Sequence, residues 1–345
     1  MTVYLGLLFL WVVLSLAVYA SPLPREKGQR LLLILGITAL FLLLALKKDT
    51  VGRDILGYRQ QYRIAGTMPF RDFDYVYFEK GYLLLTKLFA KAGLSFRCFT
   101  AAVYGLLFWG YYRFLRRHSE NMTLSLLILM CYQFLVFHIS GLRQSLAMGI
   151  CLFAFLSLED GHRLRSLLLT LAAAAVHRGA LAFLMVYPIR ALRERRLPGF
   201  LYLLCPAAAL VLRPVLWRAA LLLFSDISPP GPPVLGGNLV FLAGMAAFLL
   251  YTQSADPFPN GQFSAHMALG ALCCDLVLSG SPLLRCNLFY TLFLIPGIPN
   301  ALARYEYRTR LVLGTALGVF LVILFYTDTL SINQLGLLPY RFFWQ

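Results

Sequence analysis

Runs of about 17 to 20 apolar residues recur along the whole chain, and each is long enough to cross the ~30 Å hydrocarbon core of a bilayer. Lipid cannot satisfy backbone hydrogen bonds, so spanning segments of this length have to be helices. Hydrophobic residues make up 60% of the sequence and charged residues only 13%, which excludes an ordinary water-soluble domain. We therefore predict an all-α, polytopic membrane helical bundle that forms a single integral membrane domain over residues 1–345. The apolar runs cover residues 3–20, 30–46, 98–115, 122–139, 143–158, 199–224, 236–253, 263–279, 285–302 and 309–326.

Short loops rich in Lys and Arg determine the predicted orientation, because such loops stay on the cytoplasmic side of a membrane. All five basic loops share one side only if residues 164–189 enter the membrane and return as a hairpin with His177 and Arg178 at its tip. The chain then has about 10 to 12 transmembrane segments, with both termini outside. The five loops are residues 25–30, 113–118, 162–165, 190–196 and 304–310.

Two isolated polar pairs fall on the outer side in this topology. Arg143 and Gln144 open the run GLRQSLAMGI, where Ser140 is placed to cap an outward-facing helix N-terminus. A guanidinium beside such a terminus suits a phosphate, although an arginine that reaches lipid headgroups gives the same pattern. His177 and Arg178 form the second pair, and ionisable residues at membrane depth are functional candidates by default. A histidine bonded to a neighbouring backbone is the structural alternative.

Arg285 is a third polar group on the predicted outer side. It opens the run RCNLFYTLFLIP, and Asn287 and Tyr290 follow on the same predicted helix. Alone, Arg285 would be a charge that orients its helix. Together with the other two groups it predicts several cations around one outer-facing cavity.

Residues 47–97 also fall outside, yet they hold about ten cations, against the orientation rule. A loop of this length exceeds a simple connector, and we expect part of a site in it, with 81–93 as an amphipathic helix at the membrane interface. Glu79 is a candidate general base for a sugar hydroxyl, and nearby tyrosines can stack on sugar rings. A divalent metal at Asp72 and Asp74 is left open, and anionic lipid binding accounts for the cations equally well.

Several common motifs of soluble enzymes are absent from the sequence. It contains no charge-relay serine motif, no P-loop, no G-x-G-x-x-G and no H-E-x-x-H, which removes the common hydrolase, nucleotide-binding and zincin classes. The seven cysteines have no C-x-x-C spacing, so neither a zinc site nor a disulfide framework is predicted.

The order of the polar blocks resembles the EpsG family, which is similar to Wzy-type polysaccharide polymerases. The matching features extend over most of the chain. Two positions depart from the family pattern, because Lys80 stands where proline is more frequent and Arg178 where a lysine or small polar residue is expected. The matching features are Asp54 and Tyr58, EKGYLLL (79–85), GLRQSLAMGI (141–150), AAVHRGAL (174–181), RCNLFYTLFLIP (285–296) and PYRFFW (339–344).

The resemblance implies a GT-C-like glycosyltransferase in a bacterial cytoplasmic membrane. Such polymerases transfer a growing glycan between undecaprenyl-pyrophosphate-linked oligosaccharides at the outer face, and the expected transfer is inverting. Expected partners are the lipid-linked oligosaccharide, membrane lipid and other polysaccharide-assembly proteins, without nucleic acid and without a cofactor.

The residues and the resemblance together define a predicted site. A flippase or transporter of lipid-linked sugar is the alternative, with the same cations along a transport path, and a sugar O-acyltransferase is a third possibility. The predicted catalytic residues are Glu79, Arg143 and His177, and the predicted substrate-binding residues are Gln144, Arg178, Arg285, Asp54, Tyr58, Tyr82 and Tyr290; no metal ligand is assigned.

Overall fold

The computed structural model describes residues 1–193, 195–223 and 236–345. These residues form 17 α-helices, and no β-strand occurs among them, which confirms the predicted all-α membrane class. The chain divides into two compact units, and each is described by itself. The first consists of Met1–Ala180 and Gly314–Gln345, and the second of Leu181–Leu313.

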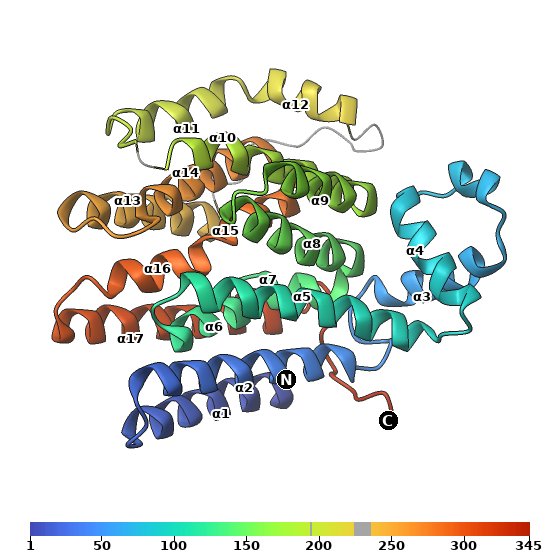
Figure 1. Cartoon of the computed structure of the whole chain (residues 1–345), viewed down its shortest axis with the longest axis horizontal. Helices are drawn as coiled ribbons and strands as arrows, with labels where there is room; N and C mark the ends of the chain where they lie inside the picture. Colours follow the sequence, from blue (N-terminus) through green and yellow to red (C-terminus); the bar gives the residue numbers. More distant parts are fainter. Residues whose placement is uncertain (194, 224–235) are drawn as a thin grey trace. The chain divides into compact units, whose positions relative to one another are not determined.

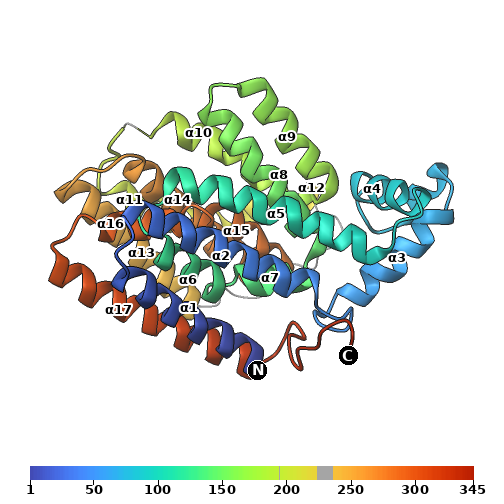
Figure 2. The same cartoon turned by 60° about the horizontal axis from the view of Figure 1, so that its bottom comes forward.

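Helices of the first unit run alongside one another, and α3 and α4 project beyond one end of α5 (Figures 1 and 2). Ser95 and Asn121 begin α5 and α6, because their side chains accept hydrogen bonds from N–H groups of the first turn. The unit contains α1 (Thr2–Ala20), α2 (Arg25–Ala45), α3 (Ile55–Thr67), a 3₁₀ turn (Phe70–Tyr75), α4 (Lys80–Lys91), α5 (Phe96–His118), α6 (Met122–Cys131), α7 (Phe134–Ser140), α8 (Leu142–Glu159), α9 (Arg163–Val176) and most of α17 (Tyr307–Leu324), with the π-helical turn Phe325–Ser331.

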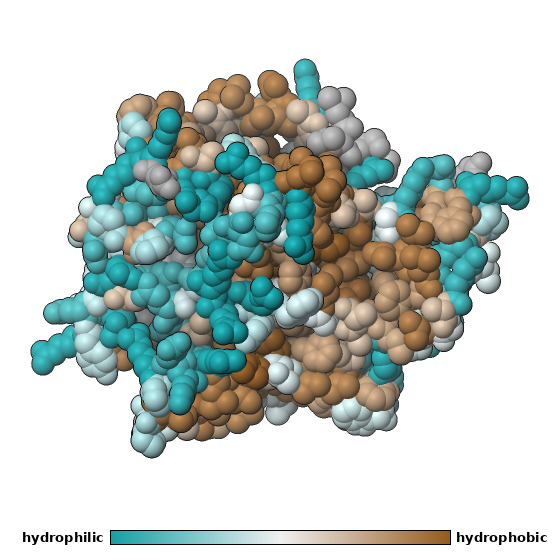
Figure 3. Space-filling model, in the orientation of Figure 1, coloured by the Kyte–Doolittle hydropathy of each residue, from teal (hydrophilic) through white to brown (hydrophobic). Residues whose placement is uncertain are grey.

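Three of the predicted basic loops share one end of this unit, as the predicted topology requires. Arg117 near the end of α5 pairs with Asp160 just after α8 at 2.5 Å. Gln29 in the second turn of α2 accepts a 2.6 Å hydrogen bond from the Met122 N–H at the start of α6. Figure 3 shows hydrophilic residues gathered over these ends of α2 and α5. The loops concerned are residues 25–30, 113–118 and 162–165.

The opposite end of the first unit holds the predicted polar residues. Since α8 ends near Asp160, its first turn with Arg143 lies at the other end of the helix. The next helix, α9, returns to that end and stops at Val176, one residue before His177. The helix therefore ends immediately before His177 and Arg178, the predicted tip of the hairpin over residues 164–189.

Residues 47–97 form a small folded layer at this end. Helix α3 packs on α4, and Ala65, Phe73 and Leu83 form its buried core. The predicted amphipathic helix is α4, which leaves Leu84 and Leu88 exposed. A large part of this predicted loop is thus ordered by its own packing.

The second unit has its own set of helices around the long helix α14. Its predicted run 285–302 is divided after Thr291, because Pro296 has no N–H to donate to the carbonyl of Leu292, four residues before it. The unit contains α10 (Val186–Ala191), α11 (Leu201–Val211), α12 (Arg213–Leu223), α13 (Gly237–Ala255), α14 (Gly261–Leu278), a 3₁₀ turn (Pro282–Asn287), α15 (Leu288–Thr291) and α16 (Leu294–Leu302). A further 3₁₀ segment, Arg178–Met185, leads into it.

Six described helices are long and apolar enough to cross a membrane, or up to eight spans if each of two bent pairs counts as one. The run 122–139 bends by 51° between α6 and α7, where Gln133 adopts a φ of 46°. The run 199–224 bends by 64° between α11 and α12, and its last residue lies outside the described part. The other predicted segments form the shorter or more charged helices α5, α9 and α16.

Candidate functional site

Glu79 is the point at which three separated parts of the first unit meet. It precedes α4, and its Oε2 accepts a hydrogen bond from the Arg143 guanidinium in the first turn of α8. Its Oε1 accepts a 3.0 Å hydrogen bond from the Arg178 N–H and lies 3.5 Å from His177 Nδ1. The side chains of Glu79 and Arg143 are only 12% and 14% exposed. All three predicted catalytic residues are therefore in one sheltered cluster.

Gly81 allows α4 to approach α9 this closely. A Cβ atom at this position would lie 2.6 Å from the Ala175 carbonyl oxygen, which is closer than real Cβ contacts. Only glycine lets the first turn of α4 rest against the last turn of α9. This contact brings the Glu79 carboxylate within reach of the Arg178 N–H.

An aromatic wall surrounds the Arg143 guanidinium. Its central carbon lies 4.3 Å from the centre of the Phe78 ring, a cation–π distance, and Arg143 also donates a hydrogen bond to Tyr58. The Tyr58 ring is stacked on Phe78 at 5.5 Å and contacts Tyr82 edge-on at 5.8 Å. Tyr77 is 5.8 Å from the guanidinium and largely exposed. The wall joins a buried charge to a surface that can stack on a sugar ring.

The charge of Glu79 is fixed by its surroundings. Burial alone would raise the pKa of this carboxyl group. The His177 ring, the Arg143 guanidinium and the Arg178 N–H outweigh burial and lower the pKa to about 2. Glu79 is consequently an anion at neutral pH and a weak base for as long as these donors hold it.

Three buried side-chain groups of the cluster have no hydrogen-bond partner among the residues that the structure describes. They are Arg143 Nε, His177 Nδ1 and the hydroxyl of Tyr82, a fully buried side chain. Buried polar groups are normally paired, so these three are available to a further partner. Together with the groups on Glu79 they make the cluster suited to an anion that has several oxygen atoms.

Other predicted residues in the first unit lie close by in the chain but differ in role. Asp54 donates its N–H to the Ser140 hydroxyl at 3.2 Å, so Ser140 supports the start of α3. The predicted helix cap by Ser140 is wrong, because Gly141 is the N-cap of α8 and no side chain caps it. Gln144 is buried in α8, whereas the Arg178 side chain is exposed and only its backbone contacts Glu79.

The acidic pair of residues 72 and 74 forms ion pairs at the surface. Asp74 lies 2.5 Å from Lys80, and Asp72 lies 3.5 Å from Arg71. Within the described ranges, no group of three or more His, Cys, Asp and Glu side chains could hold a metal ion. A metal at this pair remains a hypothesis from the sequence.

Arg285 and Tyr290 belong to the second unit and lie in its 3₁₀ turn and α15. The neighbouring Asn287 amide donates to Asp275 at 3.4 Å, and the Asn238 amide donates to the same oxygen at 2.7 Å. Asp275 is a buried carboxylate that sequence reasoning missed. A single aspartate inside the apolar run ALCCDLVLSG was the signal that could have identified it.

Phe78 is the other residue that sequence reasoning missed. The segment YVYFEKGY is dense in aromatic rings, but the pattern does not tell which ring faces the cation. Packing selects Phe78 and leaves Tyr77 at the surface.

Comparison with known proteins identifies the family of the chain. No curated protein and no solved structure matches the chain. The EpsG family model matches residues 30–342, a range that includes every predicted site residue. The chain belongs to the EpsG family, whose members are membrane proteins of the polysaccharide-polymerase type.

Proposed function

We propose that the protein polymerises polysaccharide repeat units by glycosyl transfer between undecaprenyl-pyrophosphate-linked oligosaccharides at the outer face of a bacterial cytoplasmic membrane. The observation that carries this proposal is the convergence of the Arg143 guanidinium and the Arg178 N–H on one carboxylate beside an aromatic wall. These are donors for an oxyanion, and rings of this kind bind sugars.

Glu79 occupies the place of the substrate phosphate in this proposal. A carboxylate and a phosphate accept the same hydrogen bonds, and Arg143 can donate two parallel ones to either. The donor pyrophosphate displaces Glu79 from Arg143 and also engages the free Arg143 Nε. Loss of the Arg143 guanidinium raises the proton affinity of Glu79. Binding of the lipid-linked substrate therefore turns Glu79 into a base.

The chemical step follows from these roles. An acceptor sugar hydroxyl attacks the anomeric carbon of the donor glycan as Glu79 takes its proton. The bond from the anomeric carbon to the phosphate oxygen breaks, and undecaprenyl pyrophosphate leaves with both bonding electrons. A single displacement of this kind inverts the anomeric centre. Arg143 stabilises the charge that develops on the leaving oxygen, which is a large catalytic effect.

The first experiment compares surface polysaccharide on gels from a deletion strain that carries wild-type protein, Arg143→Ala or Arg165→Ala. Arg165 is an exposed arginine at the other end of the first unit, so its variant controls for loss of one cation. We expect long-chain glycan from wild type and Arg165→Ala, and single repeats on the cell surface from Arg143→Ala. Normal polymer from a membrane-inserted Arg143→Ala protein would contradict the proposal.

A flippase is the second candidate, and one observation favours it. Two bent helix pairs, with angles of 51° and 64°, resemble the discontinuous helices that line transporter paths. In that case the deletion strain would accumulate lipid-linked repeats on the inner leaflet. Exposure of the repeats at the cell surface instead supports polymerisation.

A further inference from the structure

A pocket of about 450 Å³ lies at the end of the first unit opposite Glu79. It is lined by the first turns of α2, the end of α5 and the segment between α5 and α6. Charges of both signs line it, and they come from Arg25, Arg30, Arg116, Glu26 and Glu120. The mixed lining distinguishes this pocket from a basic surface that only orients a helix.

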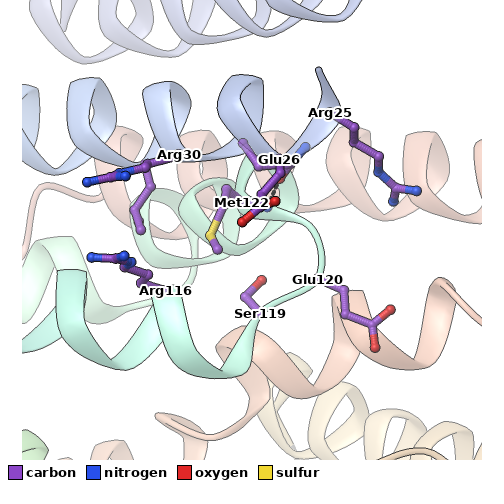
Figure 4. Close-up of a pocket in the computed structure, with 9 residues that line it drawn as sticks. Arg25, Glu26, Arg30, Arg116, Ser119, Glu120 and Met122 are labelled. Carbon is purple, nitrogen blue, oxygen red and sulfur yellow. Dashed lines mark hydrogen bonds between the residues drawn. The ribbon is translucent and has the colours of Figure 1, made fainter. Parts of the chain in front are cut away.

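The charges are separated within the pocket. Figure 4 shows the guanidinium groups of Arg30 and Arg116, from α2 and α5, on the same side. The Glu26 carboxylate lies between this pair and Arg25. Neither Arg30 nor Arg116 forms an ion pair with a carboxylate in the described part of the chain. Arg116 Nη1 donates a 3.4 Å hydrogen bond to the neutral Tyr112 hydroxyl, which leaves both positive charges without a carboxylate partner. The two guanidinium groups can therefore bind one anion, next to an acceptor for a cation.

Gln29 holds the walls of this pocket in place. Its Oε1 accepts the 2.6 Å hydrogen bond from the Met122 N–H, and its Nε2 donates a 2.6 Å hydrogen bond to the Tyr19 hydroxyl. The side chain is buried and joins α1, α2 and the start of α6. The arginine pair is thus carried by fixed helices.

Beyond the pocket, α2 continues as a helix that is long and apolar enough to cross a membrane. Leu33 lines the pocket, and Leu31, Ile34 and Leu35 are exposed on the same membrane-spanning helix. Exposed leucine and isoleucine side chains on a spanning helix face acyl chains. A ligand with a charged head and an apolar tail matches both features.

We propose that this pocket binds the headgroup of a phospholipid that carries a phosphate diester and a primary ammonium, of the ethanolamine type. Arg30 and Arg116 bind the phosphate oxygens with charge-assisted hydrogen bonds. Glu26 accepts hydrogen bonds from the ammonium. A trimethylammonium headgroup has no N–H to donate, and a glycerol headgroup brings no positive charge to Glu26.

Lipid exchange tests this site on the full-length protein. Purified protein is equilibrated in turn with vesicles of phosphatidylethanolamine, phosphatidylcholine and phosphatidylglycerol, and retained lipid is measured by native mass spectrometry. We expect wild type to retain the ethanolamine lipid on the order of five-fold better than the other two, because only its headgroup combines a phosphate with an ammonium that donates hydrogen bonds to Glu26. Equal retention of the three lipids would overturn the proposal.

Variants separate the two halves of the site. R30Q/R116Q should lower retention of all three lipids, whereas E26Q should remove only the preference for ethanolamine. R163Q/R165Q removes two exposed arginines at the same end of the unit and should change nothing. An equal loss in that control would mean that general charge attracts the lipid. If soluble phosphoethanolamine is retained as well as the lipid is, the ligand is water-soluble, and this result would also overturn the assignment.

Discussion

Glu79 and Arg143 are separated by 64 residues in the sequence, and their side chains form an ion pair that is mostly shielded from solvent. A sheltered pair of this kind interacts more strongly than an exposed one, but each partner has given up hydration. An anionic substrate can replace Glu79 with little net change in free energy, because it gives Arg143 a new negatively charged hydrogen-bond acceptor. The pair is therefore a binding site that is already filled by a ligand from the protein itself.

Glu79→Gln should bind inorganic pyrophosphate more tightly than wild type does. The amide removes a negative charge that competes for Arg143, so we expect affinity to rise on the order of ten-fold. Isothermal titration of the purified protein with sodium pyrophosphate measures the change. The same variant should lose polymer synthesis, because an amide cannot take the acceptor proton.

Asp74→Asn is the matched control for this change. It removes one carboxylate from the same segment, but that carboxylate pairs with Lys80 at the surface. We expect pyrophosphate affinity and polymer synthesis close to wild type. Tighter binding in both variants would indicate a general effect of charge and contradict the role of Glu79.

The ion pair also predicts how stability depends on pH. The folded-state pKa of Glu79 is about 2, below the ordinary value of 4.5. A lowered folded-state pKa stabilises the protein above pH 4.5, and this contribution is lost as the pH falls toward 2. Thermal unfolding in detergent should therefore show a stability difference between wild type and Glu79→Gln that is constant above pH 5 and shrinks below it. A difference that grows on acidification would contradict the pairing.

Much of the fold could be predicted from the length of the apolar runs alone. The described parts of the long runs are mainly helical, since lipid leaves a chain no other way to pair its backbone groups. The break before His177 was also visible, because the basic loops required the chain to return there. The bend at Gln133 was not visible, because it depends on one backbone angle that apolar composition does not encode.

The site was predicted in part. Glu79, Arg143 and His177 were identified singly, as polar residues in unusual places, and the structure brings these three together. Their contact depends on the approach of α4 to α9 at Gly81, which has no periodic signal. Phe78 and Asp275 were missed for a similar reason, because the importance of a ring or a carboxylate depends on which neighbour it faces.

Tyr77 offers a test of sugar binding that leaves the core intact. Its side chain is 75% exposed, although its ring lies 5.8 Å from the Arg143 guanidinium. Tyr77→Ala should shift the thermal midpoint little, and it should raise the KM for lipid-linked repeat units several-fold through the loss of about 1 kcal/mol of stacking. Tyr77→Phe keeps the ring and should behave as wild type. A fall in kcat at unchanged KM would place Tyr77 in the chemical step instead.

Gly81→Ala tests whether the contact between α4 and α9 assembles the site. The added Cβ meets the Ala175 carbonyl, so the helices must separate and Arg178 must lose its hold on Glu79. We expect a loss of about 2 kcal/mol in stability and a much larger proportional loss of polymer synthesis. Gly57→Ala in α3 is the control, since its Cβ has open space and alanine favours a helix. If Gly81→Ala lowered stability and left polymer length unchanged, the approach of α4 to α9 would serve folding alone, and Glu79 would not need the Arg178 N–H for its function.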